Sequence, residues 1–212
     1  MRFKEEVMET FLRCAKERFG LENVIVELNG LRLAENRTFV DCASYIFTTI
    51  LGLAGPPPRV VRGAYHGLYT QGVPDTSTKA GRNAVLGKIM SLMREWGQLL
   101  KKFIASEDDE VDLLLALEEF CSEDGVFEGS GEHGAVFADI FEGILQVLYH
   151  DNVDILSEEG ILKWVDEKEH ASESERRFLR AAQTFVDFLK DDDDDDDDDT
   201  SSDASETASE SD

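Results

Sequence analysis

Metal or covalent chemistry requires histidines, cysteines or nucleophiles at particular spacings, and the sequence lacks the usual combinations. The four histidines and three cysteines are scattered, and no two of them stand at a metal-ligand spacing such as C-x2-C or H-x3-H. Neither the nucleophile-elbow motif G-x-S-x-G nor the P-loop motif G-x4-G-K-[ST] is present. We therefore expect no metal, no cofactor and no covalent catalysis.

One glycine motif, Gly129–Gly134, matches G-x-G-x-x-G and precedes a helical pattern. Dinucleotide binding also requires a preceding strand within a βαβ unit, whereas the preceding segment Leu113–Cys121 has the pattern of a helix. Glu128 and Glu132 would also face the pyrophosphate. We interpret the motif as a turn between helices.

Acidic residues adjoin aromatic residues at three places in the second half of the chain. A surface of aromatic side chains in negative potential suits a lysine-rich partner segment, because charge steers the encounter and the rings anchor it. The residues are Glu118, Glu119 and Phe120, then Trp164, Asp166 and Glu167, and finally Phe185, Asp187 and Phe188. Aromatics at helical spacing are also typical of a core, so both interpretations stay open.

A second notable segment, Val26–Asn36, contains Glu27 and Asn29 among apolar residues. We expect Val26, Leu28, Leu31 and Leu33 to hold this segment against a core. The spacing alone favours a structural interpretation, in which Glu27 is an ordinary surface acid and the segment contains a capping asparagine.

Charge restricts the partners of the chain. Its 212 residues include 46 acids and 21 bases, for a net charge of −25. Residues 191–212 hold 13 acids and no base, and the remainder still has 33 acids against 21 bases. This charge disfavours direct binding to nucleic acid and favours a basic protein partner.

Targeting features and cysteines indicate a cytoplasmic protein. The N-terminus has the pattern of neither a secretion signal nor a transit peptide, and no apolar run is long enough to span a membrane. Cys14, Cys42 and Cys121 are widely spaced within hydrophobic segments, which is typical of buried thiols in a reducing compartment.

Helical periodicity dominates the chain and predicts an all-α stack of antiparallel helix pairs. We expect one domain over residues 1–190, with an irregular loop or insertion at 55–82 in which a strand at 59–62 stays open, and a disordered acidic tail at 191–212. Thr38 and Ser157 are expected helix caps. The expected helices cover residues 3–19, 21–36, 39–53, 84–104, 111–121, 135–150, 158–165 and 173–189.

Two parts of the sequence resemble the catalytic C-terminal region of the epsilon subunit of eukaryotic translation initiation factor 2B. The first is Phe3-Lys-Glu-Glu-Val7 with the E-L-N-x-L-R-x-A-x-N pattern of residues 27–36, and the second runs from Ile161-Leu-Lys-Trp164 to Phe185-Val-Asp-Phe-Leu189. Their order and spacing agree over residues 3–190, apart from 55–82. The three groups of acidic and aromatic residues around Phe120, Trp164 and Phe185 correspond to the acidic–aromatic boxes of this family, which are shared with translation initiation factor 5 and related regulators. The pattern of residues 27–36, the E-L-N segment, selects the epsilon subunit.

The resemblance implies a HEAT-like domain that promotes GDP release from translation initiation factor 2, which is guanine-nucleotide exchange. The family's exchange glutamate falls on Glu27 and a sensitive threonine on Thr10, and we expect Asn29 to hold the neighbouring surface. A family serine falls on Ala34, so its hydroxyl is missing here. Implied partners are the gamma GTPase subunit and the lysine-rich beta subunit of factor 2, with other subunits of initiation factor 2B as further candidates.

Two alternatives belong to other classes of function. The chain could be a non-catalytic adaptor or competitor that binds lysine-rich segments of factor 2 without accelerating release. It could also be an acidic chaperone for basic proteins, driven by the aspartate run. The family's large N-terminal assembly region is missing from this sequence, which fits an excised domain or a shortened homologue.

Overall fold

A computed structural model describes residues 2–57, 63–72, 75–122, 136–150, 152–173 and 175–195. Across these residues all regular structure is helical, which confirms the all-α prediction. The helices are α1 (Arg2–Glu17), α2 (Leu21–Ala34), α3 (Phe39–Gly52), the short 3₁₀ helix η1 (Gly63–Leu68), α4 (Lys79–Leu100), α5 (Glu107–Cys121), α7 (Phe141–Tyr149), α8 (Glu158–Glu169), α9 (Arg177–Ala181) and α10 (Gln183–Asp195).

Capping side chains determine where several helices begin. The Thr38 hydroxyl accepts from the Asp41 N–H at 3.1 Å while the Asp41 carboxylate accepts from the Thr38 N–H, which is a capping box. The Ser157 hydroxyl accepts from the Gly160 N–H at 3.0 Å and caps α8. Both caps were predicted, and both are confirmed.

Several helix boundaries differ from the sequence-based prediction. The helix predicted for 135–150 is interrupted by a turn at 139–140, after which α7 begins at Phe141, and the helix predicted for 158–165 continues to Glu169. Helix α4 begins at Lys79 because the Thr78 hydroxyl accepts from the Gly81 N–H. Helix α5 begins at Glu107, because the Ser106 hydroxyl caps it and the four acids of its first turn interact favourably with the positive end of the helix dipole. The single helix predicted for 173–189 is two helices, α9 and α10, which meet at Ala182.

Other predictions fall partly or wholly outside the described residues. These include the strand at 59–62, the turn at Gly129–Gly134 and the tail beyond Asp195. The predicted tail begins at 191, whereas α10 continues to Asp195. Within 55–82, η1 is followed by Tyr69, which is buried.

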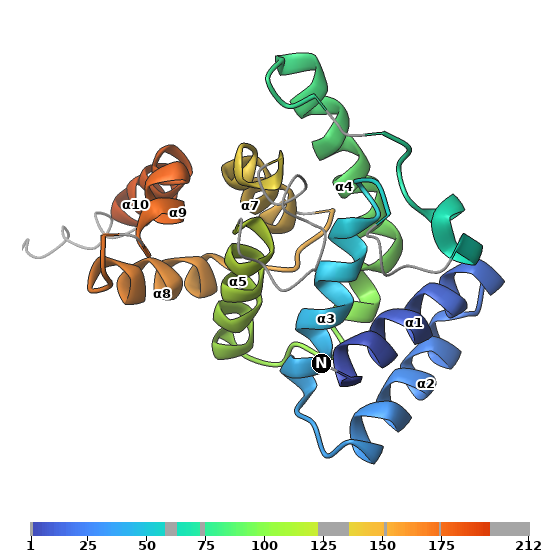
Figure 1. Cartoon of the computed structure of the whole chain (residues 1–212). Coiled ribbons are helices and arrows are strands. Elements are labelled where there is room, and N and C mark those ends of the chain that lie inside the picture. The colour runs from blue at the N-terminus through green and yellow to red at the C-terminus, as the bar shows by residue number, and fades with distance from the viewer. Residues whose placement is uncertain are drawn as a thin grey trace, which may run out of the picture.

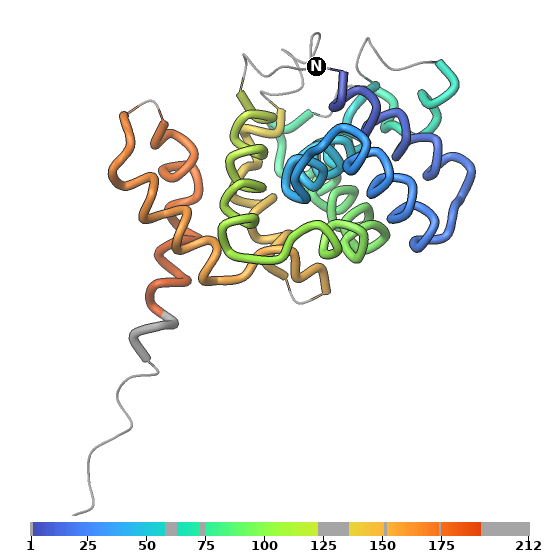
Figure 2. Tube along the Cα trace, turned by 90° about the horizontal axis from the view of Figure 1, so that it is seen from below, coloured from blue at the N-terminus to red at the C-terminus, as the bar shows by residue number. Residues whose placement is uncertain are grey.

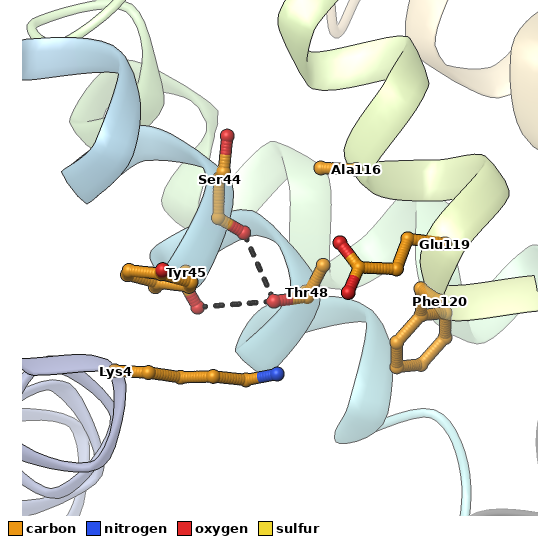
Figure 3. Close-up of a pocket in the computed structure, with 7 residues that line it drawn as sticks. All are labelled: Lys4, Ser44, Tyr45, Thr48, Ala116, Glu119 and Phe120. Atoms are coloured by element: carbon orange, nitrogen blue, oxygen red, sulfur yellow. Dashed lines mark hydrogen bonds between the residues drawn. The ribbon is translucent and has the colours of Figure 1, made fainter. Parts of the chain in front are cut away.

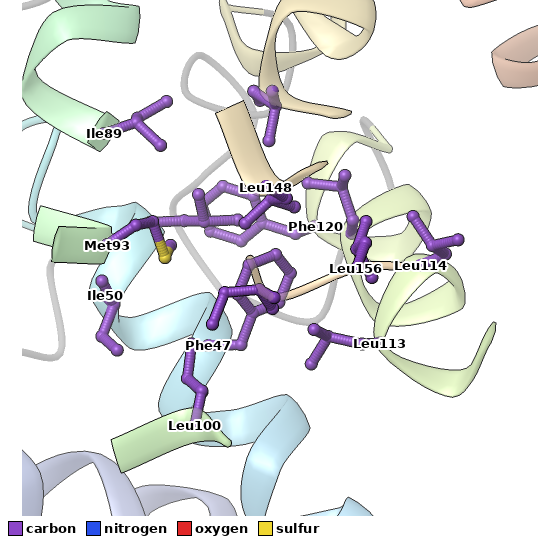
Figure 4. Close-up of a cluster of buried hydrophobic side chains, with 14 of the residues drawn as sticks. Phe47, Ile50, Ile89, Met93, Leu100, Leu113, Leu114, Phe120, Leu148 and Leu156 are labelled. Atoms are coloured by element: carbon purple, nitrogen blue, oxygen red, sulfur yellow. The ribbon is translucent and has the colours of Figure 1, made fainter. Parts of the chain in front are cut away.

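The helices form a stack in which α1 and α2 occupy one end and α8, α9 and α10 the other (Figures 1 and 2). Between them, α3, α4, α5 and α7 surround the middle of a hydrophobic cluster that extends from Phe3 to Leu189. Figure 4 shows this middle, where Phe47 of α3, Met93 of α4 and Leu148 of α7 meet. The E-L-N segment and the last two acidic–aromatic boxes therefore lie at opposite ends of the molecule.

Candidate functional site

Glu27 lies at the surface of α2, on the side that borders α1. Its Oε2 accepts a hydrogen bond from Arg13 Nη2 at 2.9 Å, and its side chain is 45% exposed. The Arg13 guanidinium lies 5.6 Å from the centre of the Phe19 ring, which helps to hold it in place. The first two helices thus fix a solvent-accessible carboxylate whose present partner is a single arginine.

Thr10 and Asn29 relate to Glu27 in different ways. Thr10 is partly buried and precedes Arg13 by three residues on α1, so the two share a helix face. Asn29 Oδ1 instead accepts from Arg32 Nε at 2.9 Å, and the Arg32 guanidinium lies 3.9 Å from the Phe39 ring centre. Thr10 therefore lies on the face of α1 that carries Arg13, the partner of Glu27, whereas Asn29 contacts Arg32, which stacks on Phe39 at the start of α3.

The expectation that Val26 and Leu33 face a core is wrong. Their side chains are 69% and 67% exposed, whereas Leu28 is fully buried. Val26 and Leu33 are seven residues apart, which places them on one face of α2, away from the face that packs on the core. Sequence reasoning missed this exposed apolar pair, although the seven-residue spacing distinguishes it from the buried set.

Glu118 and Trp164 are parts of a buried polar network between α5 and α8. Glu118 Oε1 accepts from Trp164 Nε1 at 2.8 Å, and Glu118 Oε2 pairs with Lys168 Nζ at 2.6 Å. Trp164 is fully buried, and the side chains of Glu118 and Lys168 are only 12% and 10% exposed. These groups satisfy one another and hold α8 on α5.

Of the four aromatic residues in the boxes, only Phe188 offers its ring to solvent. Phe120 and Phe185 are each 7% exposed and Trp164 is fully buried, whereas Phe188 is 53% exposed. The Phe120 ring packs edge-on against Phe137 at 4.9 Å between centres. A set of exposed aromatic anchors is thus not what the structure shows: three rings belong to the core.

The acids next to these rings mostly face outward, in two groups. Glu119 is exposed and lies near Lys4, Tyr45 and Phe120 around a small pocket between α1, α3 and α5 (Figure 3). Burial lowers the pKa of Lys4, and the Glu119 carboxylate opposes this shift. The other exposed acids are on α8 and α10, and they are Asp166, Glu167 and Asp187.

The three cysteines are buried, as predicted, and are free thiols. Burial raises the pKa of the Cys42 thiol to about 12 and also raises the pKa of Cys121. Within the described ranges, no cluster of three or more His, Cys, Asp or Glu side chains could hold a metal ion. None of the helices described here combines the length and the apolar character needed to cross a membrane.

Comparison with known proteins gives the family. A model of the W2 family, described as eIF4-gamma/eIF5/eIF2-epsilon, matches residues 109–199. The translation initiation factor eIF2B subunit epsilon of Dictyostelium discoideum is 31% identical over 190 residues, which is 90% of this chain and 23% of the relative. The chain is an eIF2B epsilon-like C-terminal region.

Further relatives of this eIF2B epsilon-like region point to two kinds of protein. The eIF2B subunit epsilon of Schizosaccharomyces pombe is 27% identical over 190 residues, 88% of this chain and 22% of the relative. The eIF5-mimic protein 2-B of Danio rerio is 28% identical over 123 residues, 58% of this chain and 26% of the relative. The chain spans about a quarter of the length of these relatives.

Proposed function

We propose that this eIF2B epsilon-like region acts in translation initiation by promoting GDP release from initiation factor 2. The observation that carries the proposal is the similarity to two eIF2B epsilon subunits over 90% and 88% of the chain. A match of that length includes both the α2 segment with Glu27 and the acidic end at α8–α10. The gamma GTPase subunit is the expected target of the first, and the lysine-rich beta subunit that of the second.

Nucleotide exchange requires a difference in affinity and no bond to be broken. The region must bind the GDP-free or opened GTPase more tightly than the GDP-bound form, which shifts the population towards release. By linkage, GDP weakens the binding of this region by the same factor. The surface that contacts the GTPase therefore needs a group that competes with the nucleotide or its magnesium.

Glu27 is suited to this competition because its carboxylate is accessible to solvent and forms an ion pair with one residue, Arg13. A cation in the GTPase pocket that stabilises magnesium or phosphate would replace Arg13 at the carboxylate or share it. The exposed side chains of Val26 and Leu33 offer apolar contact on the same helix. Thr10 would contribute from the neighbouring surface of α1, and Asn29 would support the start of α3.

The acidic end supports tethering of the lysine-rich segment. The exposed acids Asp166, Glu167 and Asp187 supply negative potential there, and Phe188 supplies an exposed ring. Glu119 adds an exposed acid apart from them, on α5 beside α1 and α3. The buried residues of the boxes act indirectly, since Glu118, Phe120, Trp164 and Phe185 hold the helices that carry the exposed acids. Two contacts at opposite ends of the stack would raise the effective concentration of each for its target.

A non-catalytic adaptor is the second candidate, and the similarity to two eIF5-mimic proteins favours it. The Danio rerio proteins 2-B and 2-A are 28% and 33% identical to this chain over 123 and 98 residues. An adaptor of this kind would occupy factor 2 through the acidic end without accelerating release of GDP.

Release of fluorescent GDP from purified initiation factor 2 distinguishes the two functions. We expect the wild-type chain to accelerate release and Glu27→Gln to lose the acceleration while it still binds factor 2. Glu22→Gln is the matched control, because Glu22 is an exposed acid in the first turn of the same helix. Tight binding with no acceleration by the wild-type chain would establish the adaptor, and equal loss in both variants would remove Glu27 from the site.

A further inference from the structure

The basic residues of the chain are concentrated around α4. Residues 55–104 contain eight lysines and arginines and only two acids, whereas the whole chain has 46 acids and 21 bases. This segment has a formal charge of +6 within a protein of −25. Such a local reversal of sign creates a surface that attracts anionic groups.

Bases on the solvent side of α4 have no acidic partner in the described part of the chain. Lys88 and Arg94 of α4 and Lys102 just after it are exposed and make no ion pair there. The bases that pair with carboxylates elsewhere are Arg2, Arg13, Lys101, Lys163, Lys168, Arg176, Arg180 and Lys190. Exposed bases without an ion pair in the described residues also occur at the end of α1, at Lys16 and Arg18. What distinguishes the group around α4 is its local excess of bases over acids in a chain with about two acids for every base, which favours an acidic ligand. We call Lys88, Arg94 and Lys102 the basic face.

Small residues between these bases leave the basic face open. Ala84, Gly87 and Ser91 are all exposed on α4. A Cβ atom added at Gly87 would meet nothing within 4 Å. An extended acidic peptide could therefore lie close to the helix, with its carboxylates reaching bases on both sides.

Two acids lie near the bases of the basic face. Glu95 is seven residues from both Lys88 and Lys102, on the same side of the helix, and Asp75 lines a pocket with Ala84 and Lys88.

We propose that the acidic segment 196–212 of the same chain binds the basic face. This segment contains eight acids and no base in its 17 residues. It follows α10, and α7 lies between α10 and α4 (Figures 1 and 2). Seventeen extended residues reach about 56 Å, about three times the roughly 20 Å between the axes of two helices that pack on opposite sides of a third. Attachment to the same chain gives an effective concentration on the order of millimolar, so modest affinity suffices.

Binding in this way would make the basic face and a lysine-rich partner competitors for the same acids. A partner that captures residues 196–212 would expose the basic face, and an occupied basic face would keep other polyanions away from α4. Nucleic acid is a less suitable occupant, because its phosphates would approach a protein of net charge −25. The proposal does not depend on nucleotide exchange.

The test uses a fluorescent peptide of residues 196–212 and the chain ended after Asp195, which keeps every buried hydrophobic residue of the described structure. Fluorescence anisotropy at low salt should show that the peptide binds the shortened chain at least tenfold more tightly than the full chain, whose own segment competes. The variant K88E/R94E/K102E of the shortened chain should bind at least tenfold more weakly than its parent. Binding should fall steeply with salt.

The control variant R2E/K16E/R18E changes the net charge equally at exposed bases of α1 and its end. Weakening of the same size in the control would overturn the proposal, because net charge alone would then explain the binding. The proposal would also be overturned if the peptide did not bind the shortened chain, whether or not labelled single-stranded RNA bound that chain. Sedimentation of the full chain tests a second copy as the source of the acids. Dimers that dissociate with salt would mean that the acidic segment of one copy binds the basic face of another, which would also overturn the proposal.

Discussion

Replacement of Glu118 by glutamine tests whether this acid has a structural role. The substitution keeps the side-chain size but removes the charge opposite Lys168, whose side chain is only 10% exposed. Loss of one partner from a buried ion pair typically destabilises a protein by about 3–5 kcal/mol. Because small proteins have unfolding free energies of about 5–15 kcal/mol, the variant would lose a large part of its stability.

Urea unfolding followed by far-ultraviolet circular dichroism measures this loss. With a denaturant dependence of about 2.5 kcal/mol per M, a loss of about 4 kcal/mol lowers the midpoint by about 1.6 M. Circular dichroism is preferred to fluorescence because the chain has two tryptophans, and the substitution alters the surroundings of Trp164 directly.

A double-mutant cycle completes the test of the network. Lys168→Met should also be destabilising, because it leaves the Glu118 carboxylate without its cation, while the combined E118Q/K168M should cost clearly less than the sum of the two. A cost below about 1 kcal/mol for Glu118→Gln, or costs that simply add, would refute the reasoning. Glu167→Gln is the matched control, since Glu167 is an exposed acid next to Lys168 on α8.

Three further predictions follow from close contacts and burial. In Gly160→Ala the new Cβ would lie 2.0 Å from Oε2 of Glu110, so urea unfolding should show a loss of about 2 kcal/mol. Burial raises the pKa of Cys42 from 9.0 to about 12, so the unfolded state binds fewer protons over this range. Cys42 alone should then lower stability between pH 9 and 12 by about 1.4 kcal/mol per pH unit. Burial also raises the pKa of Cys14 and Cys121, so urea titrations should show that Cys42→Ala reduces the slope by this amount and leaves the contribution of the other two thiols. Phe185→Ala should cost about 3 kcal/mol, whereas Phe188→Ala should leave stability within about 0.5 kcal/mol but weaken binding of a lysine-rich peptide in calorimetry.

Periodicity was sufficient to predict the helices but not which face of every helix is buried. Helix α2 is the instructive case, because apolar residues occur on both of its sides and Val26 and Leu33 are indistinguishable in type from Leu28. Which side packs on the core is decided by α1 and α3, which lie elsewhere in the sequence. The break at Ala182 was missed for a similar reason, since the apolar pattern continues across it.

The polar contacts of the candidate site could not be predicted from spacing. Lys168 would be expected at the surface, and its partner Glu118 lies 50 residues away on another helix. The Arg13–Glu27 pair joins two helices across a turn and likewise has no signature in the sequence. Residue types thus indicated Glu27 and the acids of the boxes, whereas the partners of these acids could be identified only from the structure.

Burial divides the acidic–aromatic boxes into supporting and contacting residues. Glu118 and Glu119 are neighbours on α5, yet the first carboxylate is enclosed by Trp164 and Lys168 and the second faces solvent. Substitution of either could weaken partner binding, but for different reasons. Loss of Glu118 would loosen α8, whereas loss of Glu119 would remove negative potential from the surface and the carboxylate that supports the charge of Lys4. Binding measured beside stability separates them, because only a contacting residue lowers affinity in a variant that unfolds at the wild-type urea concentration.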